Sequence, residues 1–419
     1  MLDPATTPHS SRSISLDDAR PAAPRRRAGF PQGIMLLLPI TMAVMGVSVL
    51  TPVVHLLLEH FQDVPNYEYL VMGGVVTMPS IWVLLLSPSA GWLADRYGRR
   101  RVLIWSMVAY AFVGVAPVAL DNLYAVIVSR AGVGICEAVV MTVSTTMISD
   151  YFKGRARERW LASQTAVASI SALGIIYLGG QLGAAYGWRG PFYLYVYSLV
   201  LVAGIITLTW EPTAEEKNTA PGVAPDTAEY QTFPWWRLIG ICGVTLLGSI
   251  SFYTVITKNA EALVVLGVSD PARIGTLSML ATIGVPLGTF IYWGLSRLPI
   301  PWLLCVDFAL IGSGFVAMGH ATEPLSYEWG TFINQIGCGL VLPSLLVWAT
   351  RGLAFNIRGR GTGMWSAAFA IGQFLSGMII TAISKPLGGL LPTLSMMGAC
   401  GLAIAAVAAG WGLIARRSA

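Results

Sequence analysis

The stretch that decides the fold is Gly91-Trp-Leu-Ala-Asp95-Arg96-Tyr-Gly98-Arg99-Arg100-Arg101, a short charged loop between two long apolar segments. Glycines suit a tight turn and the close approach of neighbouring helices. Arginines remain in water beside anionic lipid headgroups. Asp95 can pair with an arginine or cap the N-terminus of a helix. The loop therefore predicts two membrane helices with their charged connection outside the hydrocarbon.

The composition agrees with a membrane protein. Hydrophobic residues make up 55% of the 419 positions and charged residues only 11%, whereas a soluble domain carries roughly 25% charged residues. Twelve segments have the roughly 20 apolar residues that a helix needs to cross the bilayer. They are Ile34–Leu58, Tyr69–Leu93, Val102–Leu120, Leu123–Ile148, Leu161–Leu182, Pro191–Thr209, Leu238–Ile256, Ile274–Leu295, Trp302–Gly319, Gly330–Thr350, Gly363–Ile383 and Leu391–Ala415.

The spans form two sets of six around the longest polar stretch, Glu211–Pro234, which is rich in Pro, Thr, Ala and acidic residues. This layout predicts an all-α membrane protein with two pseudo-symmetric halves of six helices, because paired repeats are typical of secondary transporters. The predicted domains are a cytosolic disordered tail (1–33), an N-terminal bundle (34–210), a cytoplasmic linker (211–235) and a C-terminal bundle with a short cytosolic tail (236–419).

Positive charge indicates the orientation. If both termini are cytoplasmic, 21 of the 26 Lys and Arg residues lie on the cytoplasmic side of the twelve spans, as the positive-inside rule predicts. The net charge of +5 then comes from these topogenic arginines, and no basic patch with interleaved aromatic residues indicates nucleic-acid binding. We expect a multi-pass protein of the cytoplasmic (inner) membrane that acts as a monomer in the lipid bilayer.

The sequence lacks the short motifs of ATPases, metal sites and redox centres. It contains no GxxxxGK[ST] loop, no HExxH and no CxxC pair among its five cysteines. Since no clustered catalytic set is found either, we expect a protein that is not an enzyme and that binds no metal or cofactor. Transport must then use an ion gradient, the solute gradient or a separate subunit, and a proton gradient is the energy source we expect.

The charged loop resembles, nearly position for position, the G-x-L-A-D-R-x-G-R-R-[KR] loop of the major facilitator superfamily. A second stretch, Arg130-Ala-Gly132-Val-Gly134-Ile-Cys-Glu137-Ala138, resembles the family's R-x-G-x-G-x-[EA]-A pattern, and the resemblance continues to about Phe192. It implies alternating access to a central cavity and a latch that holds the cytoplasmic gate shut. The candidate latch residues are Gly91, Asp95, Arg96, Gly98, Arg99 and Arg100. A loop that only anchors the topology is the alternative.

Arg130 and Glu137 are the candidates for energy coupling. They are seven residues apart, which places them on one helical face, about 10 Å apart along the axis. An ionisable group in hydrocarbon is costly, so it usually faces a cavity or a partner. Glu137 can carry a proton or a substrate charge, and a purely structural network around Arg130 is the alternative. If Glu137 is structural, His55 and Asp307 are the next candidates.

The polar and aromatic side chains of the helices around the expected cavity indicate the class of solute. These candidates are Trp82, Thr145, Tyr177, Tyr253, Asn334, Gln335, Trp365 and Gln373. They predict an apolar, aromatic site with few fixed charges, which suits an amphipathic or aromatic organic molecule. Aromatic residues also fill helix interfaces and form interfacial belts, so a structural role is the alternative.

The sequence therefore predicts a secondary transporter that exports a small organic solute in exchange for protons, similar to the bacterial drug and organic-solute efflux branch of the family. Two features depart from the antiporter pattern. Span five has Gly174-Ile-Ile-Tyr177-Leu-Gly179-Gly180, without the proline of the G-x-x-x-G-P-x-x-G-G motif, and span one has no acidic residue. A proton-coupled importer of an organic acid or nutrient, or a uniporter, is the alternative.

Overall fold

The structure, a computed structural model, describes residues 28–212, 233–351, 353 and 355–417, and within these residues it contains helices and no strand. The first half comprises α1 (Phe30–Leu37), α2 (Ile40–Ser48), η2 (Thr51–Val53), α3 (Val54–His60), α4 (Tyr67–Tyr69), η3 (Leu70–Val76), α5 (Met78–Tyr97), α6 (Arg99–Val115), η4 (Ala116–Ala119), α7 (Leu123–Tyr151), α8 (Gly154–Tyr186), η5 (Gly187–Val196) and α9 (Tyr197–Leu208). The second half comprises α11 (Trp235–Val265), α12 (Pro271–Thr282), α13 (Gly284–Leu295), α14 (Ile300–Gly319), α15 (Pro324–Thr350), α16 (Phe355–Ser384) and α17 (Leu390–Arg417). The all-α fold class is confirmed, and most of the predicted tail and linker lie outside the described residues.

The helices account for twelve membrane crossings. In the described part of the chain, ten segments are long and apolar enough to span a bilayer, and the pair Tyr67–Val76 and Met78–Tyr97, bent by 41°, raises the number to eleven. One of the ten, Gly154–Leu208, is 55 residues long. It reverses direction at Gly187, whose φ of 64° is the left-handed conformation that glycine adopts readily. This segment therefore contains two of the predicted spans.

Two predicted spans are broken helices. Span one extends over Phe30–His60 but is interrupted after α1, where Pro39 removes a backbone donor, and again at η2. Span two breaks at Thr77, whose hydroxyl donates to Met72 O at 3.0 Å and to Phe374 O at 2.9 Å. Because Phe374 lies on α16, this second bond also joins the two halves.

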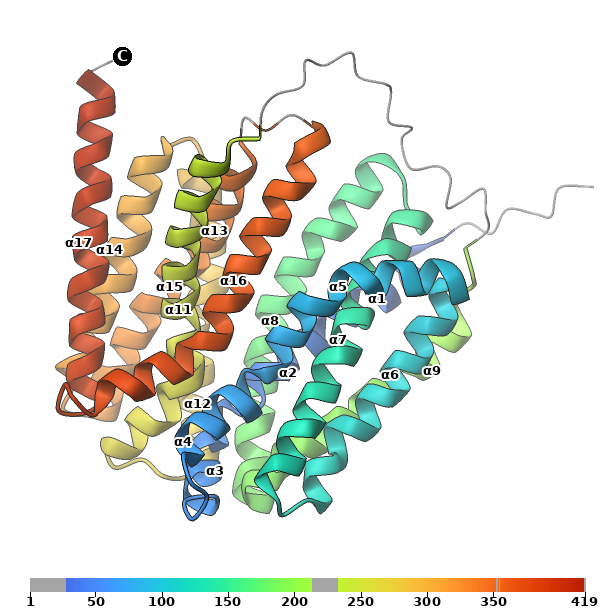
Figure 1. The fold of residues 1–419 in the computed structure, drawn as a ribbon, viewed down its shortest axis with the longest axis horizontal. Coiled ribbons are helices and arrows are strands. Elements are labelled where there is room, and N and C mark those ends of the chain that lie inside the picture. Colours follow the sequence, from blue (N-terminus) through green and yellow to red (C-terminus); the bar gives the residue numbers. More distant parts are fainter. Residues whose placement is uncertain (1–27, 213–232, 352, 354, 418–419) are drawn as a thin grey trace, which may run out of the picture.

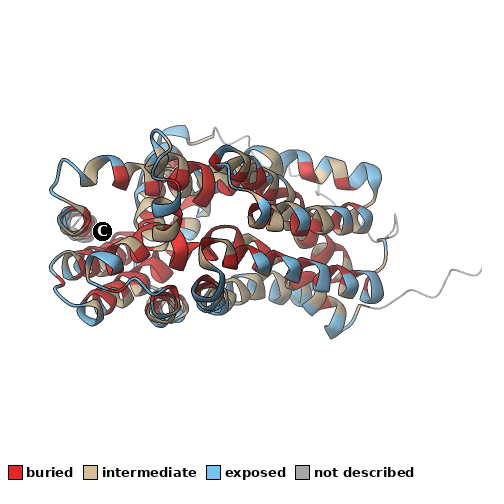
Figure 2. Ribbon diagram, turned by 90° about the horizontal axis from the view of Figure 1, so that it is seen from below, coloured by how far each residue is buried: buried red, intermediate tan, exposed pale blue. Residues whose placement is uncertain are grey.

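Each half has its own apolar core, and the outer surface is apolar as well. One buried cluster extends from Leu36 to Ile205 and another from Val255 to Ala408. Figure 2 shows buried residues along the interior of both bundles and exposed residues on their outer faces. The exposed side chains include large apolar ones such as Trp105 (72%) and Trp293 (74%). A surface of this kind is stable only in contact with lipid.

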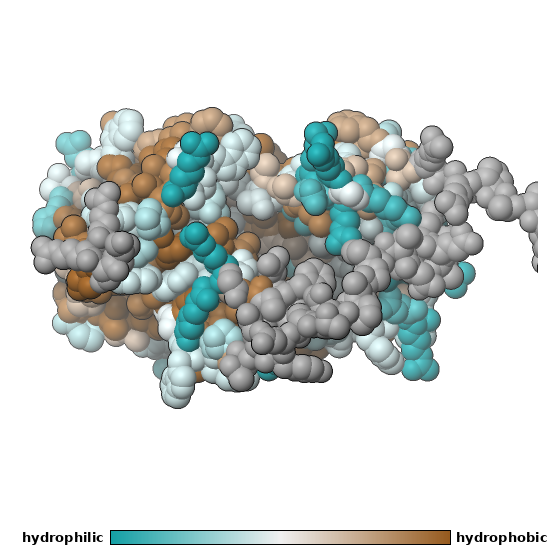
Figure 3. Space-filling model, turned by 90° about the horizontal axis from the view of Figure 1, so that it is seen from above, coloured by the Kyte–Doolittle hydropathy of each residue, from teal (hydrophilic) through white to brown (hydrophobic). Residues whose placement is uncertain are grey.

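The two halves touch at one end of the molecule. His55 Nε2 on α3 lies 3.0 Å from Ser269 O, and Lys385 Nζ forms an ion pair with Glu68 Oε1 at 3.0 Å. Figure 1 shows the bundles close together at this end, near α3, α4 and α12, and spread apart at the end where α11 begins. Seen from the open end, the space-filling surface is hollowed between the bundles (Figure 3). The molecule is thus closed on one side and open on the side of the linker.

Candidate functional site

The charged loop between α5 and α6 forms an ion-pair network within the first half. Arg99 donates to Asp95 Oδ1 through Nη2 at 2.9 Å and through Nε at 3.1 Å. Its Nη1 is paired with Asp150, which ends α7 and is buried. Arg99 therefore joins the loop to α7 through two carboxylates, and Asp150 is a member of the network that the sequence interpretation did not select.

Glu211 is a second residue that the sequence interpretation missed. Its carboxylate accepts from the backbone N–H groups of Arg99 at 2.7 Å and Arg100 at 2.9 Å, so it caps the N-terminus of α6. Gly98 has a φ of 94°, a conformation that side chains other than hydrogen rarely adopt. A Cβ there would also lie 3.3 Å from the Glu211 carboxyl. The glycine and the carboxylate cap together fix the turn.

The loop makes no described contact across the halves that would form a closed gate. Asp95 pairs with Arg99 and is 61% exposed, Arg96 lies over Trp92 with its guanidinium 5.5 Å from the ring centroid, and a Cβ at Gly91 would meet nothing within 4 Å. The expectation that Gly91 permits a close helix contact is therefore wrong for this state. A charged loop that does not contact the second half is expected of a molecule that is open on this side.

Arg130 is completely buried, and each of its three guanidinium nitrogens donates a hydrogen bond. Its Nε donates to Val75 O at 2.8 Å, its Nη1 to the Tyr195 hydroxyl and its Nη2 to Gly46 O. The guanidinium also lies 5.6 Å from the Tyr195 ring centroid. These bonds connect α7 to η3, α2 and η5, so the geometry matches the structural network that was the alternative interpretation of this residue.

Glu137 lies seven residues after Arg130 on α7, about two helical turns along the same face. Its side chain is only 8% exposed. Its Oε2 has no hydrogen-bond partner, and the described residues place no cation in ion-pair contact with it. It faces α2 at Gly46, where a Cβ would lie 2.5 Å from Oε2, so only glycine leaves room for the carboxyl. Tyr253 of the second half is close enough to interact electrostatically with it. Glu137 is thus an unpaired carboxyl at the boundary between the halves.

Aromatic rings of the second half continue from this boundary. Tyr253 on α11 packs against the apolar core of the first half and lies 5.7 Å from the Phe369 ring on α16, and Trp365 stacks on Phe369 at 5.7 Å with the planes 18° apart. The indole nitrogens of Trp365 and of Trp82 on α5 are buried without a hydrogen-bond partner. The array offers planar stacking surfaces and one buried indole N–H without a partner, that of Trp365.

The remaining predicted cavity residues separate into two groups. Thr145 on α7 accepts from Gln164 Nε2 at 3.0 Å, Tyr177 on α8 is 39% exposed, and Gln373 on α16 is half-buried. Asn334 and Gln335, in contrast, are 0% and 1% exposed inside the second bundle. Asn334 donates to Ile311 O at 3.1 Å on α14. Both residues therefore pack between helices of their own half in this state, and their role in the cavity stays a prediction.

Comparison with known families agrees with the sequence resemblance. The family model described as Major Facilitator Superfamily matches residues 36–377 of the chain. A tetracycline resistance protein, class G, from Vibrio anguillarum is 24% identical over 379 residues, covering 85% of this chain and 91% of the relative. The 4-hydroxybenzoate transporter PcaK of Pseudomonas putida is 24% identical over 137 residues, covering 33% of this chain and 29% of the relative.

Other curated relatives, named as transporters of anions or of multiple drugs, align over only 24–35% of their own length. Among solved structures, a bacterial homologue of the human lysosomal transporter Spinster, in an inward-facing and unoccupied conformation, has a TM-score of 0.70 at 17% identity. The match covers 93% of this chain and 98% of that one. At this identity the likeness shows the fold.

Proposed function

This chain belongs to the major facilitator superfamily, and on that premise we propose that it exports a small aromatic or amphipathic solute across the cytoplasmic membrane in exchange for protons. The family and its full-length relatives indicate a membrane transporter rather than an enzyme. The observation that carries the proposal is the position of an unpaired carboxyl, Glu137, beside the aromatic array of Tyr253, Phe369 and Trp365.

The array supports an aromatic solute. Offset or edge-to-face contacts between rings stabilise a bound planar molecule beyond the burial of its apolar area. The indole N–H of Trp365 has no hydrogen-bond partner and, once uncovered, would orient a carbonyl, hydroxyl or carboxylate on that molecule. Relatives named for tetracycline resistance and 4-hydroxybenzoate transport support the same class, because both compounds contain an aromatic ring.

Glu137 supports the coupling to protons. A carboxyl buried without an ion-pair partner is costly to charge, and for Glu137 this desolvation outweighs the attraction of Arg130, so the closed states of the cycle favour its neutral, protonated form. When the cavity opens, water can stabilise the charged form and the proton can leave. Gly46 keeps this carboxyl directly against α2. Movement of the first half against the second would therefore change the surroundings of the carboxyl on its Tyr253 side in each cycle.

The orientation follows from the positive-inside pattern. If the linker is cytosolic, the open side faces the cytoplasm, and the state described is the one that takes up a solute for export. Both termini are then cytoplasmic. The latch network of Asp95, Arg99 and Asp150 would engage the second half only when this side closes.

The proposal is tested with purified protein in proteoliposomes under an imposed pH gradient. Tetracycline, ethidium and 4-hydroxybenzoate serve as probes, because they share an aromatic ring and differ in charge. We expect at least one probe to move uphill, opposite to the protons. Movement in the same direction as protons would indicate the importer, and equal rates with and without the gradient would indicate a uniporter.

Glu137→Gln tests the coupling group. We expect loss of uphill transport driven by the pH gradient, with solute binding and downhill exchange retained, because the amide keeps the size but cannot exchange a proton. Asp307→Asn is the matched control: Asp307 is 0% exposed on α14, within the second bundle. Uphill accumulation by Glu137→Gln would show that Glu137 is structural. Loss of uphill transport in Asp307→Asn, with Glu137→Gln unaffected, would assign coupling to Asp307.

A further inference from the structure

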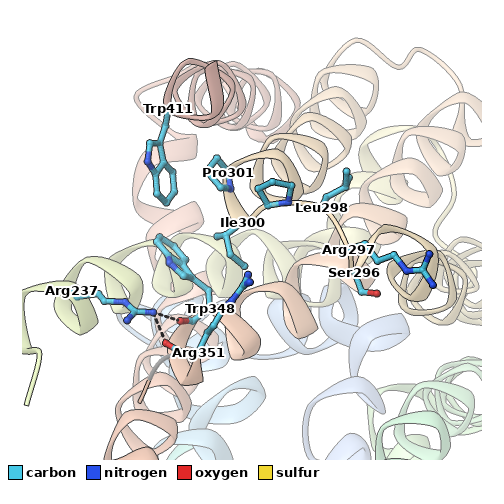
Figure 4. Close-up of a pocket in the computed structure, with 10 residues that line it drawn as sticks. Arg237, Ser296, Arg297, Leu298, Ile300, Pro301, Trp348, Arg351 and Trp411 are labelled. Carbon is cyan, nitrogen blue, oxygen red and sulfur yellow. Dashed lines mark hydrogen bonds between the residues drawn. The ribbon is translucent and has the colours of Figure 1, made fainter. Parts of the chain in front are cut away.

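A basic pocket lies at the open end of the second half, separate from the aromatic array. It is a cavity of about 640 Å³ lined by Arg237, Ser296, Arg297, Leu298, Pro299, Ile300, Pro301, Trp348, Arg351 and Trp411. These residues come from the start of α11, the connection between α13 and α14, the end of α15 and the last turns of α17 (Figure 4). Four separate elements of one bundle therefore meet around it.

The three arginines of this pocket have different roles. Arg237 Nη2 donates to Arg351 O at 2.6 Å and to Trp348 O at 3.3 Å, so it caps the C-terminus of α15. The side chains of Arg297 and Arg351 are exposed and form no ion pair with any described residue. Two guanidinium groups thus remain free to bind an anion. The N-terminus of α14, which has no side-chain cap, adds a partial positive charge to the same wall.

The outer rim of the pocket is apolar. Trp411 is 44% exposed and lies 5.9 Å from the Trp348 ring. Leu298 (37% exposed) continues this apolar surface at the pocket wall. Tryptophan next to arginine is typical of the membrane–water interface, where one side of a site meets hydrocarbon and the other meets water. The pocket therefore lies where lipid headgroups are found.

We propose that this pocket binds the headgroup phosphate of an anionic phospholipid from the leaflet on the linker side. A planar guanidinium group holds phosphate oxygens in two-pronged geometry. Arg351 lies beside Trp348 and Arg297 lies on the far side of the pocket (Figure 4), so Arg351 would hold the phosphate and Arg297 would attract it electrostatically. The exposed apolar side chains of Trp411 on α17 and of Leu298, which precedes α14, would contact the acyl chains, which a free phosphate does not have. The bound lipid would connect α11, α14, α15 and α17 at the end where the halves separate. This site is independent of the solute and of the direction of transport.

The test uses protein in nanodiscs of neutral phosphatidylcholine that contain increasing fractions of a photoactivatable phosphatidylglycerol. Cross-linked peptides are identified by mass spectrometry. We expect cross-links at residues 296–301 and near Trp411. In Arg297→Gln/Arg351→Gln the apparent affinity at these peptides should fall on the order of thirty-fold, since each arginine near an anionic surface contributes about a factor of five. Arg237 is left unchanged because it caps α15.

Arg155→Gln/Arg159→Gln is the matched control, since it removes two exposed arginines at the linker end of the first half. Cross-linking at the pocket should equal that of the wild type. Equal cross-linking of the pocket variant would overturn the proposal. Competition by millimolar inorganic phosphate, together with thermal stabilisation by phosphate in neutral lipid, would also overturn it and identify a site for a soluble anion. Transport by both variants shows that they are folded.

Discussion

Gly180→Ala is a direct test of how the two halves close. Gly180 on α8 lies against α12 of the other half, where a Cβ would be 2.6 Å from Pro271 O and 2.8 Å from Gly275 Cα. Both atoms belong to the backbone, which cannot rotate away as a side chain could. An added methyl group must therefore separate the halves at their closed end.

The expected size of the effect follows from this overlap. Carbon atoms in contact prefer about 3.5–4.0 Å, so the new methyl group falls short of Gly275 Cα by about 0.7 Å at least. Overpacking of this kind costs about 1–3 kcal/mol. This cost arises only in the state in which α8 and α12 are in contact. The state that is open at this end does not incur it. The ratio of the two states should therefore shift by about 5- to 150-fold toward the state that is open at α3, α4 and α12.

The assay is a distance measurement by electron spin resonance between labels on Glu59 of α3 and Val265 at the end of α11, two exposed positions on opposite halves. Gly180→Ala should add a population at longer distance and lower solute binding from the linker side. Gly174→Ala is the matched control on the same helix, because a Cβ there would meet nothing within 4 Å. An unchanged distance distribution, or the same change in both variants, would refute the reasoning.

Three further predictions concern the networks. Asp95→Asn should abolish transport without loss of folded protein, because Arg99 loses the charge of one of its two carboxylate partners; normal rates in proteoliposomes would reduce the loop to a topological anchor. Arg130→Lys should lower the stability of the first half by on the order of 3 kcal/mol, since a lysine cannot maintain three divergent hydrogen bonds. Thermal unfolding in detergent measures this loss, and Arg101→Lys, at an exposed position, is the control. The hydrogen bond to Glu68 raises the pKa of Lys385, so this pair should be intact at neutral pH and break on the alkaline side as the pH rises through that raised value. Glu68→Gln should remove this alkaline transition from the spin-label distances.

The sequence alone determined the number of crossings, the division into halves and the family. These properties depend on local composition: an apolar run of sufficient length spans the bilayer wherever it occurs, and arginines remain on one side of it. The charged loop could be identified for the same reason, since its glycines and charges act within a few residues. Even the importance of Arg130 and Glu137 could be predicted, because an ionisable group within an apolar helix needs an explanation.

Only the tertiary structure decided what these residues contact. The helices are apolar on every side, so the sequence contains no periodic signal that shows which face of α15 meets the cavity, and only the structure shows that Asn334 and Gln335 are buried inside their own half. Glu211 caps α6 although it lies more than a hundred positions from Arg99, and no local pattern predicts that pairing. The same holds for Glu137 and Tyr253, which approach each other from different halves. Their meeting depends on how two separately packed bundles rest against each other, and that is a property of the assembled fold.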